Sequence, residues 1–163
     1  MEIESTLNSS NGDIYRVIYN EDSPLKNLSG KSLNTVHAFC FFRDKLVIVY
    51  SLKKGHWAPP GGGIEKGETI EQAVAREAKE ETNMRVLRQE IIGYQDVYEP
   101  SSIVRQSLSF CIVEPCGYFI ADPDGDITEI KLIDPLEYKR YFDWGPIGKR
   151  LMAKALEMKR FLT

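Results

Sequence analysis

Apolar and polar residues alternate, or apolar residues gather in short runs, over most of this chain, and this spacing is typical of β-strands. The segments with this pattern are residues 13–19, 35–42, 45–50, 86–98, 103–114 and 127–133. Arg43-Asp44 should join two of them as a hairpin, and the two longest should form a second antiparallel pair. We expect residues 13–19 to be a short edge strand after a flexible N-terminal segment at residues 1–12. Residues 53–63, with two prolines and four glycines, should be a rigid connector.

The spacing becomes helical in three segments. Thr69 and Gln72 match a capping box, so a helix should begin there and continue to about Thr82. Two further helical segments are expected at residues 135–141 and 145–161. Strands on both sides of a central helix, with another helix at the end, favour an α/β fold, and specifically an α/β/α sandwich with a mixed β-sheet.

The composition is that of an ordinary soluble globular protein. The 163 residues suffice for one domain with a hydrophobic core, but not comfortably for two. The net charge is −3 and the basic residues are scattered, so a surface for duplex nucleic acid is not expected. The sequence predicts no membrane segment and a cytoplasmic location, because the apolar runs are strand-sized and the first residues lack a secretion signal. Three cysteines without metal-type spacing should be reduced structural residues: Cys40, Cys111 and Cys116.

Three glutamates of the predicted central helix lie where apolar side chains would be expected. The apolar face of this helix is formed by Ile70, Ala73, Val74 and Ala78. Glu77 and Glu81 fall near the middle of that face and Glu80 at its edge, whereas a solvated acidic helix end would place them beside Lys79. Carboxylates this close need protons or cations to neutralise them in a partly dry site. Hard divalent ions such as Mg²⁺ are the usual partners of clustered oxygen ligands.

The segment at residues 62–84 resembles the signature box of the Nudix hydrolase family. That box reads Gly, five residues, Glu, seven residues, Arg-Glu, an apolar residue, any residue, Glu-Glu, any residue, Gly and an apolar residue. The chain matches it with Gly62, Glu68, Arg76, Glu77, Ala78, Glu80, Glu81 and Met84. Asn83 replaces the second Gly, and Asn is the best alternative to Gly in the left-handed geometry of a helix end. We therefore do not interpret the departure as a loss of activity.

The resemblance implies a Nudix-like sandwich that hydrolyses a nucleoside diphosphate linked to a group X, with Mg²⁺ or alternatively Mn²⁺ as cofactor. The metal ligands that it implies are Gly61, Glu77, Glu80 and Glu81. The catalytic residues that it implies are Arg76, Glu77, Glu80 and Glu129. Glu77 would be a ligand or the general base, and Arg76 would orient a neighbouring carboxylate. Glu129 is similar to an extra ligand or base of some family members, but an exposed strand residue fits this position equally well.

The box does not specify the group X. We expect a (d)NTP-type pyrophosphatase, with ADP-ribose or another nucleotide sugar as the alternative substrate. Pro100 lies where ADP-ribose hydrolases of the family often carry a proline, but a surface turn explains it equally well. An alternative of another class is a module that binds a nucleotide or a partner protein without hydrolysis, and the presence of every box carboxylate argues against it. A homodimer is one candidate assembly.

Other residues give weaker signals. The acidic cluster at residues 122–126 could suggest a calcium loop, but its twelfth position is Ile133, where such a loop needs Glu, so a turn is expected. His37 and His56 are each expected to be structural or surface residues. Four aromatic residues could stack on a nucleotide base or simply belong to the core: Trp57, Tyr94, Tyr98 and Tyr118.

Overall fold

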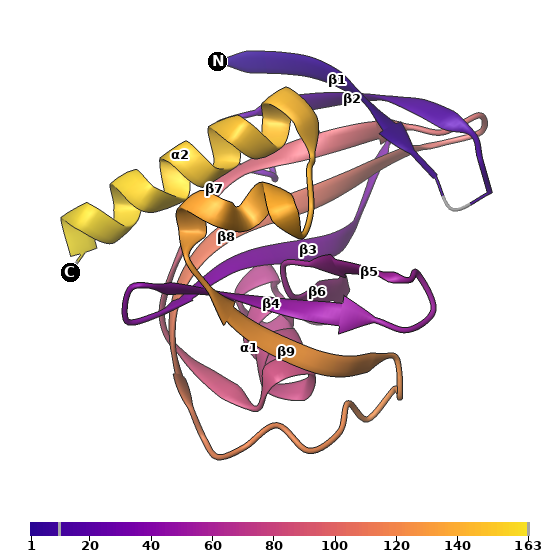
Figure 1. Ribbon diagram of the computed structural model, residues 1–163. Coiled ribbons are helices and arrows are strands. Elements are labelled where there is room, and N and C mark those ends of the chain that lie inside the picture. The colour runs from indigo at the N-terminus through magenta and orange to yellow at the C-terminus, as the bar shows by residue number, and fades with distance from the viewer. Residues whose placement is uncertain (10, 163) are drawn as a thin grey trace.

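A mixed β-sheet of nine strands organises the computed structural model, which describes residues 1–9 and 11–162 (Figure 1). The strands are β1 (Glu2–Asn8), β2 (Ile14–Asn20), β3 (Lys31–Phe42), β4 (Lys45–Ser51), β5 (His56–Ala58), β6 (Gly61–Gly63), β7 (Met84–Tyr98), β8 (Ile103–Pro115) and β9 (Ile127–Ile133). The helices are α1 (Ile70–Thr82), the 3₁₀ helix η1 (Pro135–Arg140) and α2 (Gly145–Leu162). Every predicted helix and strand is therefore present, and the expected connector contains two short strands, β5 and β6.

The strand order confirms the predicted mixed sheet. The main path is β1-β2-β7-β8-β3-β4-β5, while β6 pairs with β3 and β9 pairs with β4. β3 and β8 are parallel, and the other pairs are antiparallel. The predicted hairpin joins β3 to β4 through a turn in which Arg43 has a φ of 55°. The second predicted antiparallel pair is β7 with β8.

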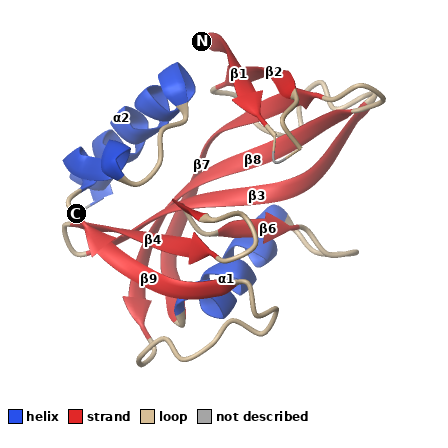
Figure 2. Ribbon diagram, turned by 45° about the vertical axis from the view of Figure 1, so that its right-hand side comes forward, coloured by secondary structure: helices blue, strands red, loops and turns tan. Residues whose placement is uncertain are grey.

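One helix covers each face of the sheet, which confirms the predicted sandwich (Figure 2). The core beneath α2 includes Phe39, Phe41, Leu108, Phe110, Leu151 and Ala155. The core beneath α1 includes Val36, Ala38, Cys40, Cys111, Ala73 and Val74. Neighbouring residues of a strand point to opposite faces, so β3 contributes side chains to both cores.

The N-terminal residues differ from the prediction. Residues 2–8, expected to be flexible, form β1 and pair with β2 in continuous antiparallel register. β2 is not an edge strand, because it lies between β1 and β7. Most side chains of β1 are exposed, and a strand with few buried positions carries little hydrophobic alternation in its sequence. The polar composition of the segment therefore concealed the strand.

Two features raised by the composition are visible in the structure. Cys40 and Cys111 are buried neighbours on β3 and β8, whereas Cys116 is exposed, and all three are free thiols. No helix within residues 1–9 and 11–162 is both long and apolar enough to cross a membrane.

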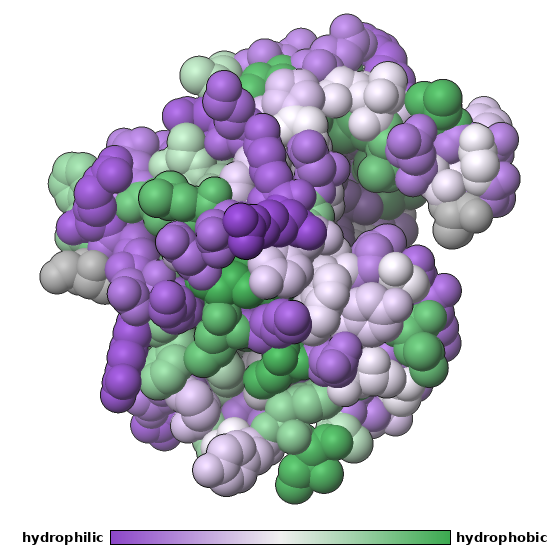
Figure 3. Space-filling view, in the orientation of Figure 1, coloured by the Kyte–Doolittle hydropathy of each residue, from purple (hydrophilic) through white to green (hydrophobic). Residues whose placement is uncertain are grey.

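The sheet face beneath α2 is only partly covered. η1 and α2 lie over one end of that face, and the first half of β3 extends beyond them toward β1 and β2 (Figure 1). Figure 3 shows a hollow in the surface between the end of the molecule that carries β1 and β2 and the end that carries β5. This part of the sheet is therefore open to a ligand.

Candidate active site

Local capping signals position the glutamate-bearing helix α1. The Thr69 hydroxyl accepts a hydrogen bond from the Gln72 backbone N–H at 3.1 Å, and the Gln72 side-chain oxygen accepts one from the Thr69 N–H at 2.9 Å. The helix ends at Asn83, whose φ of 55° and ψ of 36° are left-handed and whose N–H donates to the Lys79 carbonyl at 3.0 Å. Both predicted ends of the helix, including the role of Asn83, are confirmed. The side-chain amide nitrogen of Asn83 donates to the Tyr118 carbonyl at 3.0 Å, a contact that the sequence does not reveal.

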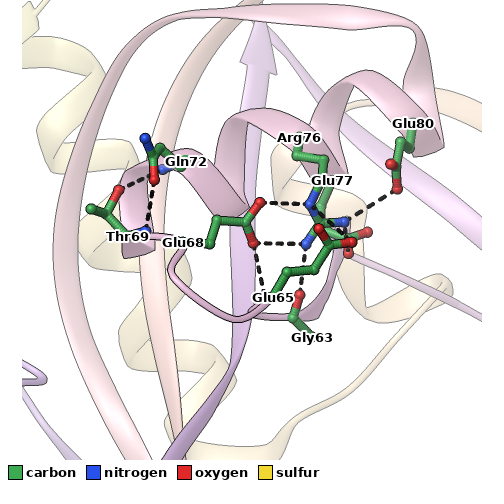
Figure 4. Close-up of polar contacts among 8 residues, drawn as sticks. All are labelled: Gly63, Glu65, Glu68, Thr69, Gln72, Arg76, Glu77 and Glu80. Carbon is green, nitrogen blue, oxygen red and sulfur yellow. Dashed lines mark hydrogen bonds and ion pairs between the residues drawn. The ribbon is translucent and has the colours of Figure 1, made fainter.

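Arg76 lies at the centre of the site and joins several carboxylates (Figure 4). Its Nε and Nη2 donate to the two oxygens of Glu68 at 2.7 and 3.0 Å, and Nη2 also donates to the Gly63 carbonyl at 2.7 Å. Its Nη1 donates to Glu77 Oε1 at 2.8 Å and to Glu80 Oε2 at 3.3 Å. These charge-assisted bonds lower the pKa of Glu68 and raise that of Arg76. Arg76 thus orients more than one neighbouring carboxylate.

The glycines of β6 allow the backbone to approach these carboxylates. A Cβ at Gly62 would lie 2.6 Å from the Glu77 carboxyl carbon, so a side chain there would displace that carboxylate, and a Cβ at Gly61 would collide with the Val36 carbonyl of β3. Pairing of Gly61 with His37 of β3 fixes the position of β6. The Gly61 N–H donates to Glu81 Oε1 at 2.9 Å. The connector predicted to bring backbone close to another group therefore brings it to Glu77 and Glu81.

Glu81 and Glu77 are destabilised as anions by their surroundings. Burial raises the pKa of Glu81 to about 8, and the charge of Glu77 adds to this rise. The hydrogen bond from the Gly61 N–H acts in the opposite direction and lowers the pKa. Burial also raises the pKa of Glu77, and the Arg76 guanidinium opposes that shift. Since one arginine faces several carboxylates, the ionised form of this site has an excess of negative charge. A proton or an added cation would relieve that excess.

The donor set fits a hard divalent cation. Several carboxylates and a backbone strand without side chains converge here, and oxygen donors of this kind suit Mg²⁺ or Mn²⁺. No group of three or more His, Cys, Asp or Glu side chains within residues 1–9 and 11–162 is already arranged to hold a metal ion. The contacts explain this, because Glu77 and Glu80 bond to Arg76 while Glu81 bonds to Gly61.

Glu129 is not part of the Arg76 network. It is exposed on β9, opposite Tyr50 of β4, and its side chain makes no hydrogen bond or ion pair with a described residue. The structure therefore brings together Arg76, Glu77 and Glu80, and places Glu81 beside Gly61, but it leaves Glu129 outside these contacts.

The acidic cluster at residues 122–126 forms the predicted turn and also influences the site. The Gly125 N–H donates to the Asp122 carbonyl at 2.8 Å, and Asp126 accepts a hydrogen bond from the Ser51 hydroxyl at 2.8 Å. The charges of Asp122 and Asp126 raise the pKa of Glu81, and the charge of Asp124 raises that of Glu77. Sequence reasoning missed this influence, because the spacing of aspartates in a turn does not show which distant helix they face.

The histidines and aromatic residues divide into buried and exposed groups. His37 is neutral at physiological pH, because burial lowers its pKa to about 4, and its ring lies edge-on to Trp144 at 5.3 Å. His56 is exposed on β5. Trp57 packs against Tyr50 and the core beneath α2. Of the other aromatic candidates for stacking on a base, Tyr94 lies beneath the Arg105 guanidinium and Tyr98 beneath that of Arg16. Tyr118 is 93% exposed.

The fold and the site together define an α/β sandwich with a cluster of glutamates around one arginine on its central helix. A model of the NUDIX domain matches residues 32–155, and the chain belongs to this family. The family assignment made from residues 62–84 is therefore confirmed.

Similar proteins differ in how much of the chain they match. The crystal structure of the Bacillus subtilis pyrophosphohydrolase BsRppH superimposes with a TM-score of 0.74 over 94% of this chain and 97% of that chain, at 20% identity. An ADP-ribose pyrophosphatase from Methanocaldococcus jannaschii is 35% identical over 96 residues, which are 59% of this chain and 51% of the relative. The nucleoside triphosphatase NudI from Salmonella heidelberg (strain SL476) is 38% identical over 52 residues, 32% of this chain and 37% of the relative. The chain spans about a third of the length of the first curated relatives it matches.

Proposed function

We propose that this protein hydrolyses the phosphoanhydride of a nucleoside diphosphate linked to a group X, in a reaction that depends on Mg²⁺ or Mn²⁺. The observation that carries the proposal is the excess of carboxylates around Arg76, on a helix face that also packs into the core. A purely structural ion pair would need one carboxylate per arginine. The preserved excess argues against a module that only binds nucleotides.

The proposed roles combine those that the Nudix resemblance implies with the contacts of Arg76. The groups that would hold the metal ion are the Gly61 carbonyl, Glu77, Glu80 and Glu81. When bound, the ion neutralises phosphate oxygens and makes water a better nucleophile at neutral pH. Arg76 positions the Glu77 and Glu80 carboxylates, and Glu68 holds Arg76 through two bonds. We propose Glu77 as the general base, with Glu80 or Glu129 as the alternatives.

We propose a (d)NTP as the first substrate class, supported by the similarity to the nucleoside triphosphatase NudI. ADP-ribose or a nucleotide sugar is the second, supported by the longer match to an ADP-ribose pyrophosphatase. Pro100 does not favour the second class, because it lies in the exposed turn between β7 and β8, where the Glu99 N–H donates to the Ser102 carbonyl at 3.0 Å.

A substrate panel tests the proposal. The protein would be incubated with NTPs, dNTPs, ADP-ribose, nucleotide sugars and diadenosine polyphosphates, with Mg²⁺ or with excess EDTA, and released monophosphate would be measured. We expect turnover of at least one class with Mg²⁺ and none with EDTA. Full activity in EDTA would refute the metal-dependent mechanism, and binding of nucleotides without any turnover would support a non-catalytic module instead.

A further inference from the structure

Strand β9 lies at an outer edge of the sheet. It pairs with β4 along one side, and no strand of the described residues lies along its other side (Figure 1). The free side of such a strand presents backbone N–H and carbonyl groups that can pair with another strand. The sheet can therefore be extended at β9.

Two opposite charges project from one face of β9. Glu129 and Lys131 are alternate residues of the strand and both are exposed, so their side chains lie on the same face. The Lys131 ammonium lies 5.2 Å from the centre of the Trp57 ring and 5.4 Å from that of Tyr141, both of which pack against the core beneath α2. Neither Glu129 nor Lys131 forms an ion pair with a described residue. Both charges are thus available to a partner at the strand edge.

The charge pattern of β9 is self-complementary about Ile130. When a second copy places its β9 antiparallel to the first, across a twofold axis at Ile130, Glu129 of each copy lies opposite Lys131 of the other. Directly opposite residues of an antiparallel pair have Cβ atoms about 4.5–5.5 Å apart, which is close enough for an ion pair. A single pairing therefore gives both charges of both copies a counter-charge.

The strand at the other end of the sheet lacks this property. β1 carries Glu2 and Glu4 on either side of Ile3, so the same operation about Ile3 would place like charges opposite each other. Glu4 already forms an ion pair with Arg16 of β2. The charges therefore favour β9 as the edge that accepts a second copy.

The other face of β9 adjoins an apolar surface. Ile130 and Leu132 line an open pocket of about 580 Å³, together with Met84, Tyr118 and Phe119. Tyr118 is 93% exposed and Leu132 is 44% exposed. Figure 3 shows apolar residues in this lower part of the molecule, where Figure 1 places β9 and the loop before it. A second copy centred on Ile130 would cover part of this surface, and removal of apolar area from water drives association.

We propose that two copies of this chain form a dimer through antiparallel pairing of their β9 strands, centred on Ile130. The partner is a second copy rather than an unrelated peptide, because the counter-charges of Glu129 and Lys131 are supplied by the same sequence in the opposite direction. The two sheets then form one continuous sheet. The proposal does not depend on the proposed function, since neither Arg76 nor α1 takes part in the pairing.

Charge reversal tests the pairing. Lys131→Glu would place two negative charges opposite each other on both sides of the axis, and Glu129→Lys would place two positive charges there. Each variant should therefore raise the dissociation constant of the dimer by about tenfold or more. A mixture of the two variants should form a heterodimer, because every charge then lies opposite its counter-charge. The control is Lys149→Glu, an exposed position of α2, which should dimerise like the wild type.

Sedimentation equilibrium would measure the dissociation constants, and circular dichroism would establish that each variant is folded. Native mass spectrometry of the mixture, with one variant labelled with ¹⁵N, would identify the heterodimer. If a charge reversal prevents folding, Lys131→Gln removes the charge without repulsion and should still weaken the dimer. A wild type that stays monomeric up to its solubility limit would overturn the proposal and would mean that the two charges only protect an open strand edge. A dimer that both reversals leave unchanged would also overturn it.

Discussion

Two arginines in this molecule form opposite kinds of network. Arg76 is partly exposed and bonds to carboxylates of Glu68, Glu77 and Glu80. Arg105 is fully buried and bonds to a single carboxylate, Asp96, at 2.8 and 3.1 Å. The first network has more negative than positive charge, whereas the second does not. The difference separates a site whose excess negative charge a proton or a cation would relieve from one whose charges are already paired.

The Arg105 network is completed by the backbone. Its guanidinium donates to the Pro24 carbonyl at 2.8 Å and to the Asn27 carbonyl at 3.3 Å, and also to the Lys26 carbonyl. Tyr94 lies 3.8 Å below it, and Lys31 bonds to the same Asp96 at 3.1 Å. Arg105 therefore fastens the loop between β2 and β3 to β7 and β8, and no donor is left for a ligand. Its role is to stabilise the fold.

The largest expected effect is on turnover and concerns the Arg76 side of the comparison. Glu81→Gln should lower kcat by about 10²–10³-fold while the fold survives, because it removes one negative ligand at nearly constant volume. The metal-free variant should be at least as stable as the wild type, since a buried amide needs no counter-charge. Steady-state kinetics with Mg²⁺ and thermal midpoints without it would measure both. Near-wild-type turnover would remove Glu81 from the proposed ligands.

The next effect is on stability and concerns the Arg105 side. Arg105→Met should reduce the free energy of unfolding by about 3 kcal/mol, because Asp96 and the loop carbonyls lose their partner in the interior. Arg85→Met is the control, since Arg85 forms an exposed ion pair with Glu114 and should contribute less than about 1 kcal/mol. Urea unfolding followed by circular dichroism would compare them. A specific activity per folded molecule that fell tenfold in Arg105→Met would contradict the separation of the two networks.

The pH dependence of stability gives a smaller effect. The pKa of Glu81 rises from 4.5 to about 8 in the metal-free fold, so the native state retains a proton that the unfolded chain has released. This contribution is fully present below pH 4.5 and is lost as the pH rises to 8. Stability of the metal-free wild type should therefore fall over that range relative to Glu81→Gln. Denaturant titrations at several pH values would measure the free energy of unfolding of both proteins. If that free energy fell equally with pH in both, Glu81 would not be the group that causes the pH dependence.

The smallest effect concerns the end of α1. Asn83→Gly should change stability by less than about 1 kcal/mol. Glycine adopts the left-handed backbone conformation without strain, and this gain offsets the loss of the Asn83 side-chain bonds to Lys79 and Tyr118. Asn83→Val should destabilise by about 1–2 kcal/mol, because a β-branched side chain clashes in that conformation. Thermal unfolding of both variants would measure the difference. Loss of activity in a stable Asn83→Gly protein would mean that the side chain contacts the substrate.

The two networks also show what a sequence can predict. The clustering of Glu77, Glu80 and Glu81 could be derived because they lie on one helix, where helical geometry fixes which residues share a face, whereas the role of Arg76 came from the family resemblance. The capping box and the role of Asn83 were predictable for the same local reason. Arg105 contacts Pro24 across 81 positions of sequence, and no local pattern pairs them. The influence of Asp126 on Glu81 and the strand β1 were missed for related reasons, since both depend on how distant segments meet.

The most direct test of the account is Mg²⁺ binding by calorimetry at pH 8 in wild type, Glu81→Gln and Arg105→Met. The account predicts that the wild type and folded Arg105→Met bind Mg²⁺ with similar affinity, because the Arg105 network takes no ligand. It predicts at least tenfold weaker binding in Glu81→Gln, which has lost a carboxylate of the charged site. Equal Mg²⁺ affinity in the wild type and Glu81→Gln would contradict the claim that the excess of carboxylates around Arg76 exists to hold a cation.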